Sequence, residues 1–308
     1  MNTEKISAKT PIAIILGAII CNILFGTAVP TIKIGYELFG ITDNMYEKIL
    51  FAGIRFFTSG VLVWLFSAIK RKGFPAVPKD KIPWIGLHGF VYTFLQYAFM
   101  YVGLSFTSGA KTTIISATSA FVLIILSHFI YKNDKINGRK IIGSCIGFAG
   151  VIIALSGNIA GSEFSLIGDG LIFLTVIAFA IGSIIGKEIT KTVDSFTMTA
   201  YNLLIGGGLL IIVAKLGGAG FENIGTGAIL ALSYLIMVSS VGFTLWATLL
   251  SKAKVGGLSV FTFVIPVSGT IFSALIAKED VFTARCMASL ALLCVGIIIV
   301  NLREKAKK

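Results

Sequence analysis

Long apolar runs alternate with short polar breaks along the whole chain of 308 residues. A helix that crosses a lipid bilayer needs about 20 mainly apolar residues, and the breaks divide this chain into ten runs of about that length. The runs lack the alternation of polar and apolar residues that marks a membrane-spanning strand. The pattern predicts an all-α integral membrane protein with ten transmembrane helices, at residues 11–32, 49–69, 82–104, 111–131, 139–156, 165–186, 195–214, 226–250, 256–277 and 284–302.

The composition agrees with this pattern, because 56% of the residues are hydrophobic and only 13% are charged. An average soluble domain has about 25% charged residues. The connections between the runs are short, so no separate soluble domain is expected. Lys5 and Lys9 precede the first run as they would in a signal peptide, but no clear A-x-A cleavage site follows, so we expect that run to remain as a helix.

Positive charge is distributed unevenly between the two sides of the predicted helices. With a cytoplasmic N-terminus and ten crossings, 19 lysines and arginines fall on the inner side and 6 on the outer side. Cytoplasmic loops of membrane proteins carry such an excess, which predicts that both termini are cytoplasmic. The same rule accounts for the net charge of +12 without a nucleic-acid partner.

The two halves of the chain match at a shift of 146 residues. The segment "YKNDKINGR" at 131–139 then falls on "AKEDVFTAR" at 277–285, and "GVIIA" at 150–154 falls on "GIIIV" at 296–300. Each half carries five predicted helices, and because five is odd the second copy crosses the membrane in the opposite sense. Two inverted five-helix repeats, at 11–156 and 165–302, are thus expected, an architecture on which many secondary transporters are built around a midplane site.

Several motifs follow one another in an order that resembles a known family. They are "AGIRFF" in the second run, "YVGLSFTSGA" before the fourth, and "VIPVSGTIFSALIAKED" in the ninth. Over 11–302 the chain resembles the EamA branch of the drug/metabolite transporter superfamily. The resemblance implies a ten-helix carrier of the bacterial inner membrane that moves amino acids and related metabolites, frequently outward, through a cavity lined by helices 1, 3, 4, 6, 8 and 9. The family's recurrent positions would be Arg55, Ser108, Gly109, Ala110, Pro266 and Glu279.

The two halves differ where the family often carries a second proline. Ala120 stands in the fourth run at the position that matches Pro266, and Tyr201 rather than a basic residue stands opposite Arg55. Carbonyl groups opened by a proline are therefore expected only in the second half.

Arg55 is a charged residue inside an apolar run, where a charge is costly and usually functional. One hypothesis is that it reaches the outer headgroups or pairs with Glu37, Asp43 or Glu47. The other is that it faces the cavity and binds a substrate carboxylate.

Polar residues recur every fourth position in the third run, at His88, Tyr92 and Gln96, and so share one helix face. That face is expected to line the cavity or to bond a neighbouring helix. In the eighth run two faces compete for the same role. One carries Tyr234 and Trp246, as the repeat suggests, and the other carries Ser240, Thr244 and Thr248.

Other candidates for substrate binding are small or amide side chains. Asn22 in the first run, Ser116 in the fourth, and Thr262 and Pro266 in the ninth could contact a solute or pack against another helix. The glycine pairs Gly143-x-x-x-Gly147 and Gly182-x-x-x-Gly186 are predicted to allow close helix packing.

The predicted function is secondary transport of a small metabolite by alternating access, with an amino-acid-like solute and export as the resemblance implies. The alternatives are another class of small solute, such as a nucleoside, a vitamin or a drug-like cation, or a channel. No run has an acidic residue in its interior, which favours downhill carriage or exchange, although His88 could titrate. The four cysteines are interpreted as packing residues, and no enzyme motif occurs. We therefore expect no catalysis, cofactor or metal. The expected partners are the small-molecule substrate and the lipid bilayer, and the sequence leaves the oligomeric state open.

Overall fold

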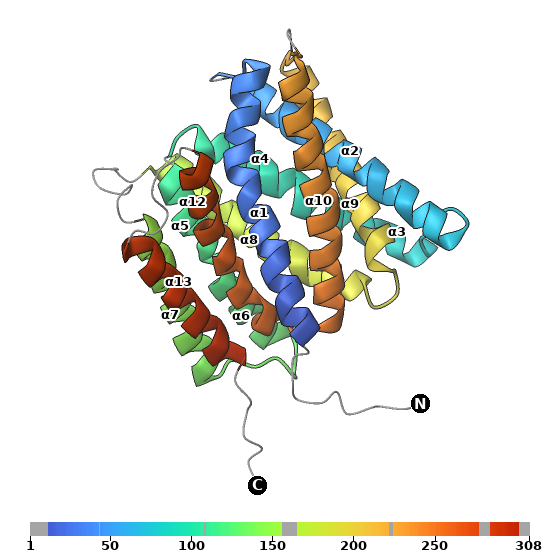
Figure 1. The fold of residues 1–308 in the computed structure, drawn as a ribbon. Coiled ribbons are helices and arrows are strands. Elements are labelled where there is room, and N and C mark those ends of the chain that lie inside the picture. The colour runs from blue at the N-terminus through green and yellow to red at the C-terminus, as the bar shows by residue number, and fades with distance from the viewer. Residues whose placement is uncertain are drawn as a thin grey trace.

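The computed structural model describes residues 12–42, 44–107, 109–155, 165–221, 224–276 and 284–301, and the regular structure within them is helical (Figure 1). Helical residues occupy every one of the ten predicted apolar runs. The α-helices are α1 (Ile12–Phe39), α2 (Met45–Arg71), α3 (Ile82–His88), α4 (Gln96–Leu104), α5 (Gly109–Ala117), α6 (Ser119–Ile130), α7 (Gly138–Leu155), α8 (Leu166–Ile189), α9 (Ser195–Leu216), α10 (Thr226–Lys252), α11 (Val255–Leu258), α12 (Val264–Ile276) and α13 (Ala284–Asn301). The other helical elements are η1 (Lys79–Lys81), the π-helix η2 (Gly89–Leu95) and the 3₁₀-helix η4 (Ser259–Phe263).

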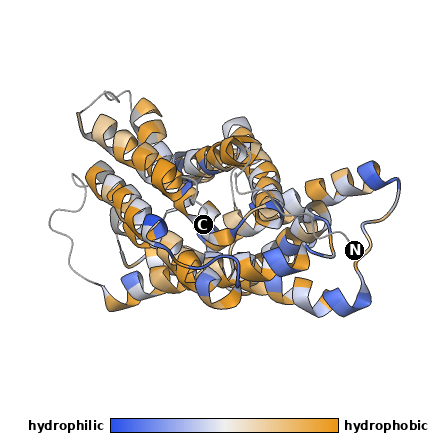
Figure 2. Ribbon diagram, turned by 90° about the horizontal axis from the view of Figure 1, so that it is seen from below, coloured by the Kyte–Doolittle hydropathy of each residue, from blue (hydrophilic) through white to orange (hydrophobic). Residues whose placement is uncertain are grey.

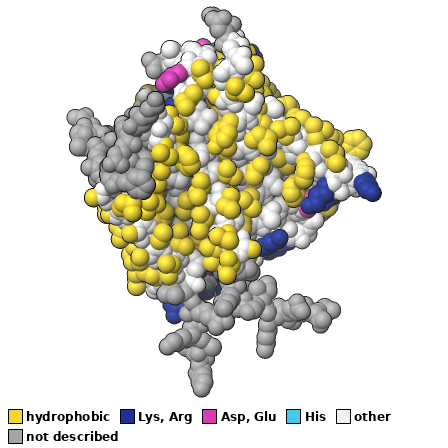
Figure 3. Space-filling view, in the orientation of Figure 1, with side chains coloured by type: hydrophobic (Ala, Val, Ile, Leu, Met, Phe, Trp, Pro, Cys, Tyr) yellow, Lys and Arg dark blue, Asp and Glu magenta, His cyan; other side chains and the backbone are white. Residues whose placement is uncertain are grey.

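Six helices of the described chain are long and apolar enough to cross a membrane: α1, α2, the continuous stretch Thr112–Ile130, α8, α9 and α10. Shorter apolar helices cover Val255–Gly269 and Met287–Asn301. Large hydrophobic side chains cover the visible flank of the bundle, and Lys and Arg gather toward its lower end (Figure 3). We call that end the basic end; α2 and α10 finish there, at Lys70, Arg71 and Lys252. Seen from this end, the helices are apolar along most of their length and the hydrophilic residues lie mainly in turns (Figure 2).

Three predicted helices are interrupted in the structure. The third run bends through the π-helix η2, and the ninth is built from α11, η4 and α12. The fourth run has a one-residue irregularity at Thr118, between α5 and α6, although it has no proline; there the Thr118 hydroxyl donates to the carbonyl of Ile115 at 2.5 Å. Irregular backbone is therefore present in both halves. The expectation that a proline opens carbonyl groups only in the second half is wrong, because Pro30 lies inside α1 of the first half.

Glycines bring two helix pairs into backbone contact. Between α2 and α9, a Cβ atom on Gly53 would lie 2.8 Å from the nitrogen of Ile211, and one on Gly60 would lie 2.7 Å from the nitrogen of Leu204. Between α7 and α13, a Cβ atom on Gly143 would lie 2.7 Å from the carbonyl oxygen of Gly296. The predicted packing role of Gly143 is confirmed.

The remaining contacts arrange the helices around α1 and α8. Helix α1 packs against α10 and α12, and helix α8 packs against α4, α5 and α6. Helix α2 also contacts α10, and helix α9 contacts η2. The region between α8, α9 and α10 is thereby closed on one side by the interrupted third helix.

A buried aspartate at the basic end forms an ion pair within the first half and a hydrogen bond to the second half. Asp134, in the turn after α6, is 2% exposed and accepts from Lys140 Nζ at 2.5 Å. Its second carboxylate oxygen accepts from the backbone nitrogen of Gly256 in α11 at 2.8 Å. Close by, Lys187 of α8 donates to the carbonyl groups of Leu250 and Ala253, at 2.7 and 2.5 Å.

Enlarging Gly143 tests the glycine contact. Gly143→Ala should destabilise the folded protein by about 1–3 kcal/mol, because the added methyl group collides with the backbone of α13. Gly138→Ala in the same helix is the matched control, since no atom lies within 4 Å of its Cβ position. Unfolding in detergent, followed by circular dichroism, measures both variants. Equal stability of the two variants would contradict the close approach.

Candidate functional site

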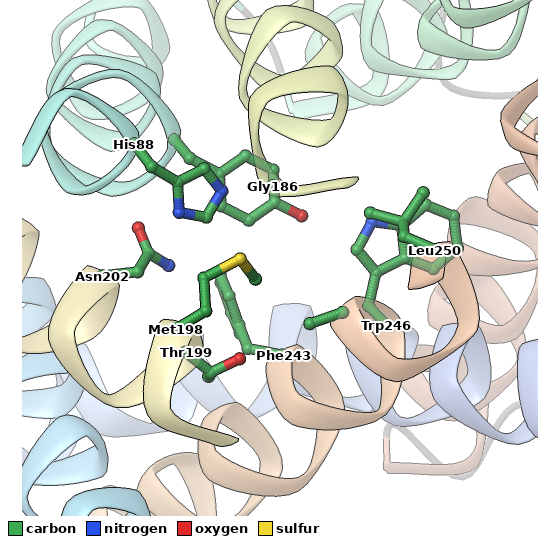
Figure 4. A pocket seen from close by; sticks show the side chains of 10 residues that line it. His88, Gly186, Met198, Thr199, Asn202, Phe243, Trp246 and Leu250 are labelled. Carbon is green, nitrogen blue, oxygen red and sulfur yellow. The ribbon is translucent and has the colours of Figure 1, made fainter. Parts of the chain in front are cut away.

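A small cavity lies between α3, η2, α8, α9 and α10, and its side chains point toward a shared centre (Figure 4). Its free volume is about 10 Å³, measured for the centre of a water-sized sphere. That is room for about one water molecule. The lining residues are His88, Tyr92, Gly186, Met198, Thr199, Asn202, Phe243, Trp246, Ala247 and Leu250.

Stacked rings form one wall of the cavity. The ring of His88 lies 5.0 Å from that of Tyr92 at an interplanar angle of 14°, and Tyr92 stacks on Phe179 at 5.7 Å. Phe179 in turn stacks on Trp246 at 6.1 Å. The π-helix η2 and the π-stacked rings thus bring residues of α3, α8 and α10 together.

Two glycines of α8 make this stacking possible. A Cβ atom on Gly182 would lie 2.3 Å from a ring carbon of Tyr92, and one on Gly186 would lie 2.9 Å from His88 Nε2. The predicted close packing at this glycine pair is confirmed. The glycines accommodate aromatic side chains of the third run, so they also shape the cavity.

Polar atoms of the lining lack the partners that buried groups usually have. Within the described chain, His88 Nδ1 and Trp246 Nε1 are buried without a hydrogen bond. Buried polar atoms are paired in the great majority of cases, and exceptions often mark a ligand or water position. Asn202, which is 1% exposed, is partly satisfied because its Oδ1 accepts from the Thr93 hydroxyl at 3.0 Å.

The structure brings three of the sequence-predicted residues together at this cavity: His88, Tyr92 and Trp246. Gln96 does not line it, although its Oε1 is also buried without a partner. Tyr234 lies elsewhere, with 43% of its surface exposed and its hydroxyl donating to Thr27 Oγ1 at 2.7 Å.

The two competing faces of α10 have different roles. The face of Trp246 lines the cavity, together with Phe243 and Ala247. The hydroxyls of Ser240, Thr244 and Thr248 each donate to the carbonyl four residues earlier in their own helix. Those hydroxyls are thereby satisfied within α10.

The remaining predicted residues lie outside the cavity, on α1, α5, η4 and α12. Asn22 is 1% exposed and donates to the carbonyl of Ala18, while its Oδ1 has no partner; Thr262 donates to the carbonyl of Ser259. Ser116 is half-buried and Pro266 is buried. Ser108 and Glu279, two of the family's recurrent positions, lie outside the described residues. Gly109 and Ala110 lie at the start of α5, and their surroundings are not described.

Helix α9 is the element that the sequence analysis missed. It is the seventh predicted run and supplies Met198, Thr199 and Asn202 to the cavity. The resemblance pointed instead to the first, third, fourth, sixth, eighth and ninth runs. Asn202 is an amide inside an apolar run, and that signal could have identified it. Met198 and Thr199 have no comparable signal, because an apolar or hydroxyl residue is ordinary in a membrane helix.

Arg55 is 2% exposed and lies inside the bundle. Its Nε donates to Ser239 Oγ of α10 at 2.7 Å, and its guanidinium carbon lies 5.0 Å from the centre of the Phe56 ring. It makes no ion pair with Glu37 or Glu47, and Asp43, the third carboxylate of the anchoring hypothesis, lies outside the described residues. The side chain is directed inward, toward α10.

An open groove of about 450 Å³ lies at the basic end. It is formed by the ends of α2 and α10 and by the turn between α8 and α9. Helices α9 and α10 therefore line both the cavity and the groove, with residues nearer the basic end in the groove. Its lining residues are Ser67, Lys70, Arg71, Thr190, Asp194, Ser195, Phe196, Thr248, Ser251 and Lys252.

Among the described residues, no group of three His, Cys, Asp or Glu side chains could hold a metal ion. An apolar helical bundle with several helices long enough to span a bilayer defines a multi-pass membrane protein.

The chain belongs to the EamA-like transporter family, which matches residues 12–156 and 166–302. The resemblance predicted from the motifs is thus confirmed. The two matched ranges coincide closely with the two predicted halves.

Several curated relatives are named as transporters. An uncharacterised transporter of Bacillus subtilis, YetK, is 26% identical over 85% of this chain and 81% of its own length. A probable amino-acid metabolite efflux pump of Escherichia coli is also 26% identical, over 85% of this chain and 86% of its own. A solved crystal structure with 17% identity superposes with a TM-score of 0.78 over 96% of this chain and 99% of the other, which shows the same fold.

A double-mutant cycle tests the polar contact beside the cavity. Thr93→Val and Asn202→Leu should each cost about 1–3 kcal/mol, because each leaves one buried polar group without its partner. The double variant should lose clearly less than the sum of the two. Detergent unfolding of the three variants and the parent gives the coupling energy, and simple additivity would show that the contact does not form.

Proposed function

We propose that this protein is a secondary transporter that moves a small amino-acid-like solute by alternating access. In this proposal the chain crosses the bacterial inner membrane ten times, as two inverted five-helix repeats at 11–156 and 165–302, with both termini in the cytoplasm. It acts as a carrier and catalyses no reaction.

The observation that carries the proposal concerns pairs of contacting helices: when each helix is replaced by its equivalent in the other half, the new pair is also in contact. A shift of 146 residues places α1 on α8, the third run on α10, α2 on α9, α6 on α12 and α7 on α13. Under that exchange the contact of α1 with α10 becomes the contact of α8 with α4, and α1 with α12 becomes α8 with α6. The pairs α2 with α9 and α7 with α13 become themselves. A twofold relation between the halves accounts for all of these pairs at once.

Such a relation supports alternating access. If two equivalent halves are related by a twofold axis in the membrane plane, exchanging the conformations of the two halves turns an inward-facing state into an outward-facing one. A site near that axis can then be reached from either side by rocking the same contacts. Irregular backbone at Thr118 and at η4, which ends one residue before the position matched to Thr118, is consistent with bending there.

The proposed solute class follows from the buried aromatic and polar groups. Stacked rings would pack on an apolar side chain, and His88 Nδ1 and Trp246 Nε1 remain to bond its polar group. The name of the Escherichia coli relative supports an amino-acid metabolite and export. The cavity holds about one water molecule in this structure, so binding of a solute would require the halves to open.

The energy source is proposed to be the solute's own gradient or exchange with another solute. Proton-coupled carriers usually keep an ionisable carboxylate inside the membrane. In the described chain, the buried carboxylates of Asp134 and Asp169 lie at the ends of helices and are engaged by Lys140 and Thr107.

Flux into proteoliposomes tests the proposal. Saturable uptake of a radiolabelled amino acid, accelerated by unlabelled solute on the opposite side, is expected for a carrier. Trp246→Phe should lower this uptake severalfold, because it removes an unpaired N–H from the cavity. Trp84→Phe is the matched control, since Trp84 is 52% exposed. Flux that neither saturates nor responds to unlabelled solute would indicate a channel instead.

Labelling of single cysteines in a cysteine-free background tests the orientation. Gly73→Cys, just beyond α2 at the basic end, should react only with reagent on the cytoplasmic side. Gly220→Cys, beyond α9 at the other end, should react only from outside. Both glycines have open space around them, so neither change should disturb folding. Reaction of both from the same side would rule out the proposed topology.

A further inference from the structure

Arg55 carries a buried positive charge that no carboxylate of the described residues neutralises. Within the described chain it makes one hydrogen bond, through Nε to Ser239, and no ion pair. Its two terminal nitrogens therefore have no acceptor among the described residues. A guanidinium keeps its charge in any protein environment, and buried charges are normally paired. An anionic group bound at this place would compensate the buried charge.

The surroundings of Arg55 supply donors and apolar rings. The Phe56 ring lies under the guanidinium and 4.3 Å from the Tyr97 ring, which in turn lies 6.5 Å from the Tyr101 ring. The hydroxyl of Tyr36 lies next to that of Tyr101. The hydroxyls of Tyr36 and Tyr101 are buried and have no hydrogen bond of normal geometry. Tyr101 is 1% exposed. Tyrosine hydroxyls and guanidinium nitrogens all donate to oxygen, so the set suits an oxygen-rich anion.

This cluster is built by four helices from both halves of the chain. Tyr36 comes from α1, Arg55 from α2, Tyr97 and Tyr101 from α4, and Ser239 from α10. A group bound here would therefore contact α4 and α10, which are equivalent helices of the two halves. That placement is expected for a site at the meeting of two repeats.

An aromatic ring connects the cluster with the cavity. Phe243 lines the cavity, and its ring also lies 5.7 Å from that of Phe56 and 6.5 Å from that of Tyr97. Phe56 packs under the Arg55 guanidinium and 4.3 Å from Tyr97. An anionic group at Arg55 would thus lie beside an apolar surface that extends toward Trp246.

We propose that Arg55, with the hydroxyls of Tyr36, Tyr97 and Tyr101, binds the carboxylate of a transported monocarboxylate that has an apolar side chain. One guanidinium can grip one carboxylate through two parallel hydrogen bonds. A phosphate monoester would bring a second negative charge for which the described cluster has no cation. The proposal rests on the proposed transport function and names the group that the transporter selects.

Ligand-induced stabilisation of the full-length, detergent-purified protein tests the proposal, because a ligand that binds the folded form raises its melting temperature. The probes are L-leucine, L-phenylalanine, phenylpropanoate, the amides of all three, and phenyl phosphate. Each carboxylate should stabilise the protein at a concentration at least tenfold lower than its amide. Equal response to acid and amide, or a stronger response to phenyl phosphate, would overturn the proposal without any variant.

Variants then assign the effect to Arg55. Arg55→Gln should weaken carboxylate binding at least tenfold and leave amide binding unchanged. Tyr101→Phe keeps the ring and should weaken carboxylate binding severalfold. Tyr46→Phe is the matched control, because Tyr46 is an exposed tyrosine near the start of α2. If Arg55 serves only to join α2 to α10 through Ser239, Arg55→Gln and Ser239→Ala would lower stability without changing the preference for the acid, and the proposal would be wrong.

Flux measurements separate this proposal from the proposed function. Saturable, trans-stimulated flux that treats acids and amides alike would preserve the transporter and refute the carboxylate site. Absence of saturable flux for every probe, together with stabilisation by carboxylates that depends on Arg55, would preserve the site and refute the transport function.

Discussion

The bundle depends on the close approach of helix backbones at glycine. Between helices in lipid the hydrophobic effect supplies little attraction, so stability comes from van der Waals packing and from bonds between helices. The contacts of Gly53 and Gly60 hold α2 against α9, and that of Gly143 holds α7 against α13. Both pairs are equivalent to themselves under the 146-residue shift. In the proposed alternating-access cycle, these two pairs would stay together while the other contacts between the halves change.

Two kinds of polar group are retained inside this apolar frame, and they have different costs. The unpaired nitrogens of His88 and Trp246 are neutral, and each lacks one hydrogen bond. Arg55 is charged and makes one hydrogen bond through Nε. Leaving a buried polar group unpaired costs about 1–3 kcal/mol, and more for a charge. Both kinds of group belong to the proposed solute-binding site.

The helices could be predicted from the sequence because apolar length alone fixes where a chain can cross lipid. His88, Tyr92 and Trp246 could also be placed, since helical spacing and the repeat pointed to them. Two features could not. The irregularity at Thr118 has no proline to indicate it, and the Thr118 hydroxyl bonds the carbonyl of Ile115 there. The contribution of Asn202 depends on which helix α9 meets, and the pattern of one helix does not contain that information.

Phe243 stands between the Arg55 cluster and the cavity. Its ring is held by Phe25 at 5.5 Å, Tyr92 at 5.9 Å and Phe56 at 5.7 Å, and its neighbour Gly242 leaves room for the Phe25 ring. In the proposed transport cycle, a solute that passes between the Arg55 cluster and the cavity has to displace this side chain and so disturb its three ring contacts. The size of the ring would then limit the rate of passage, and the polar groups on either side would set the selectivity.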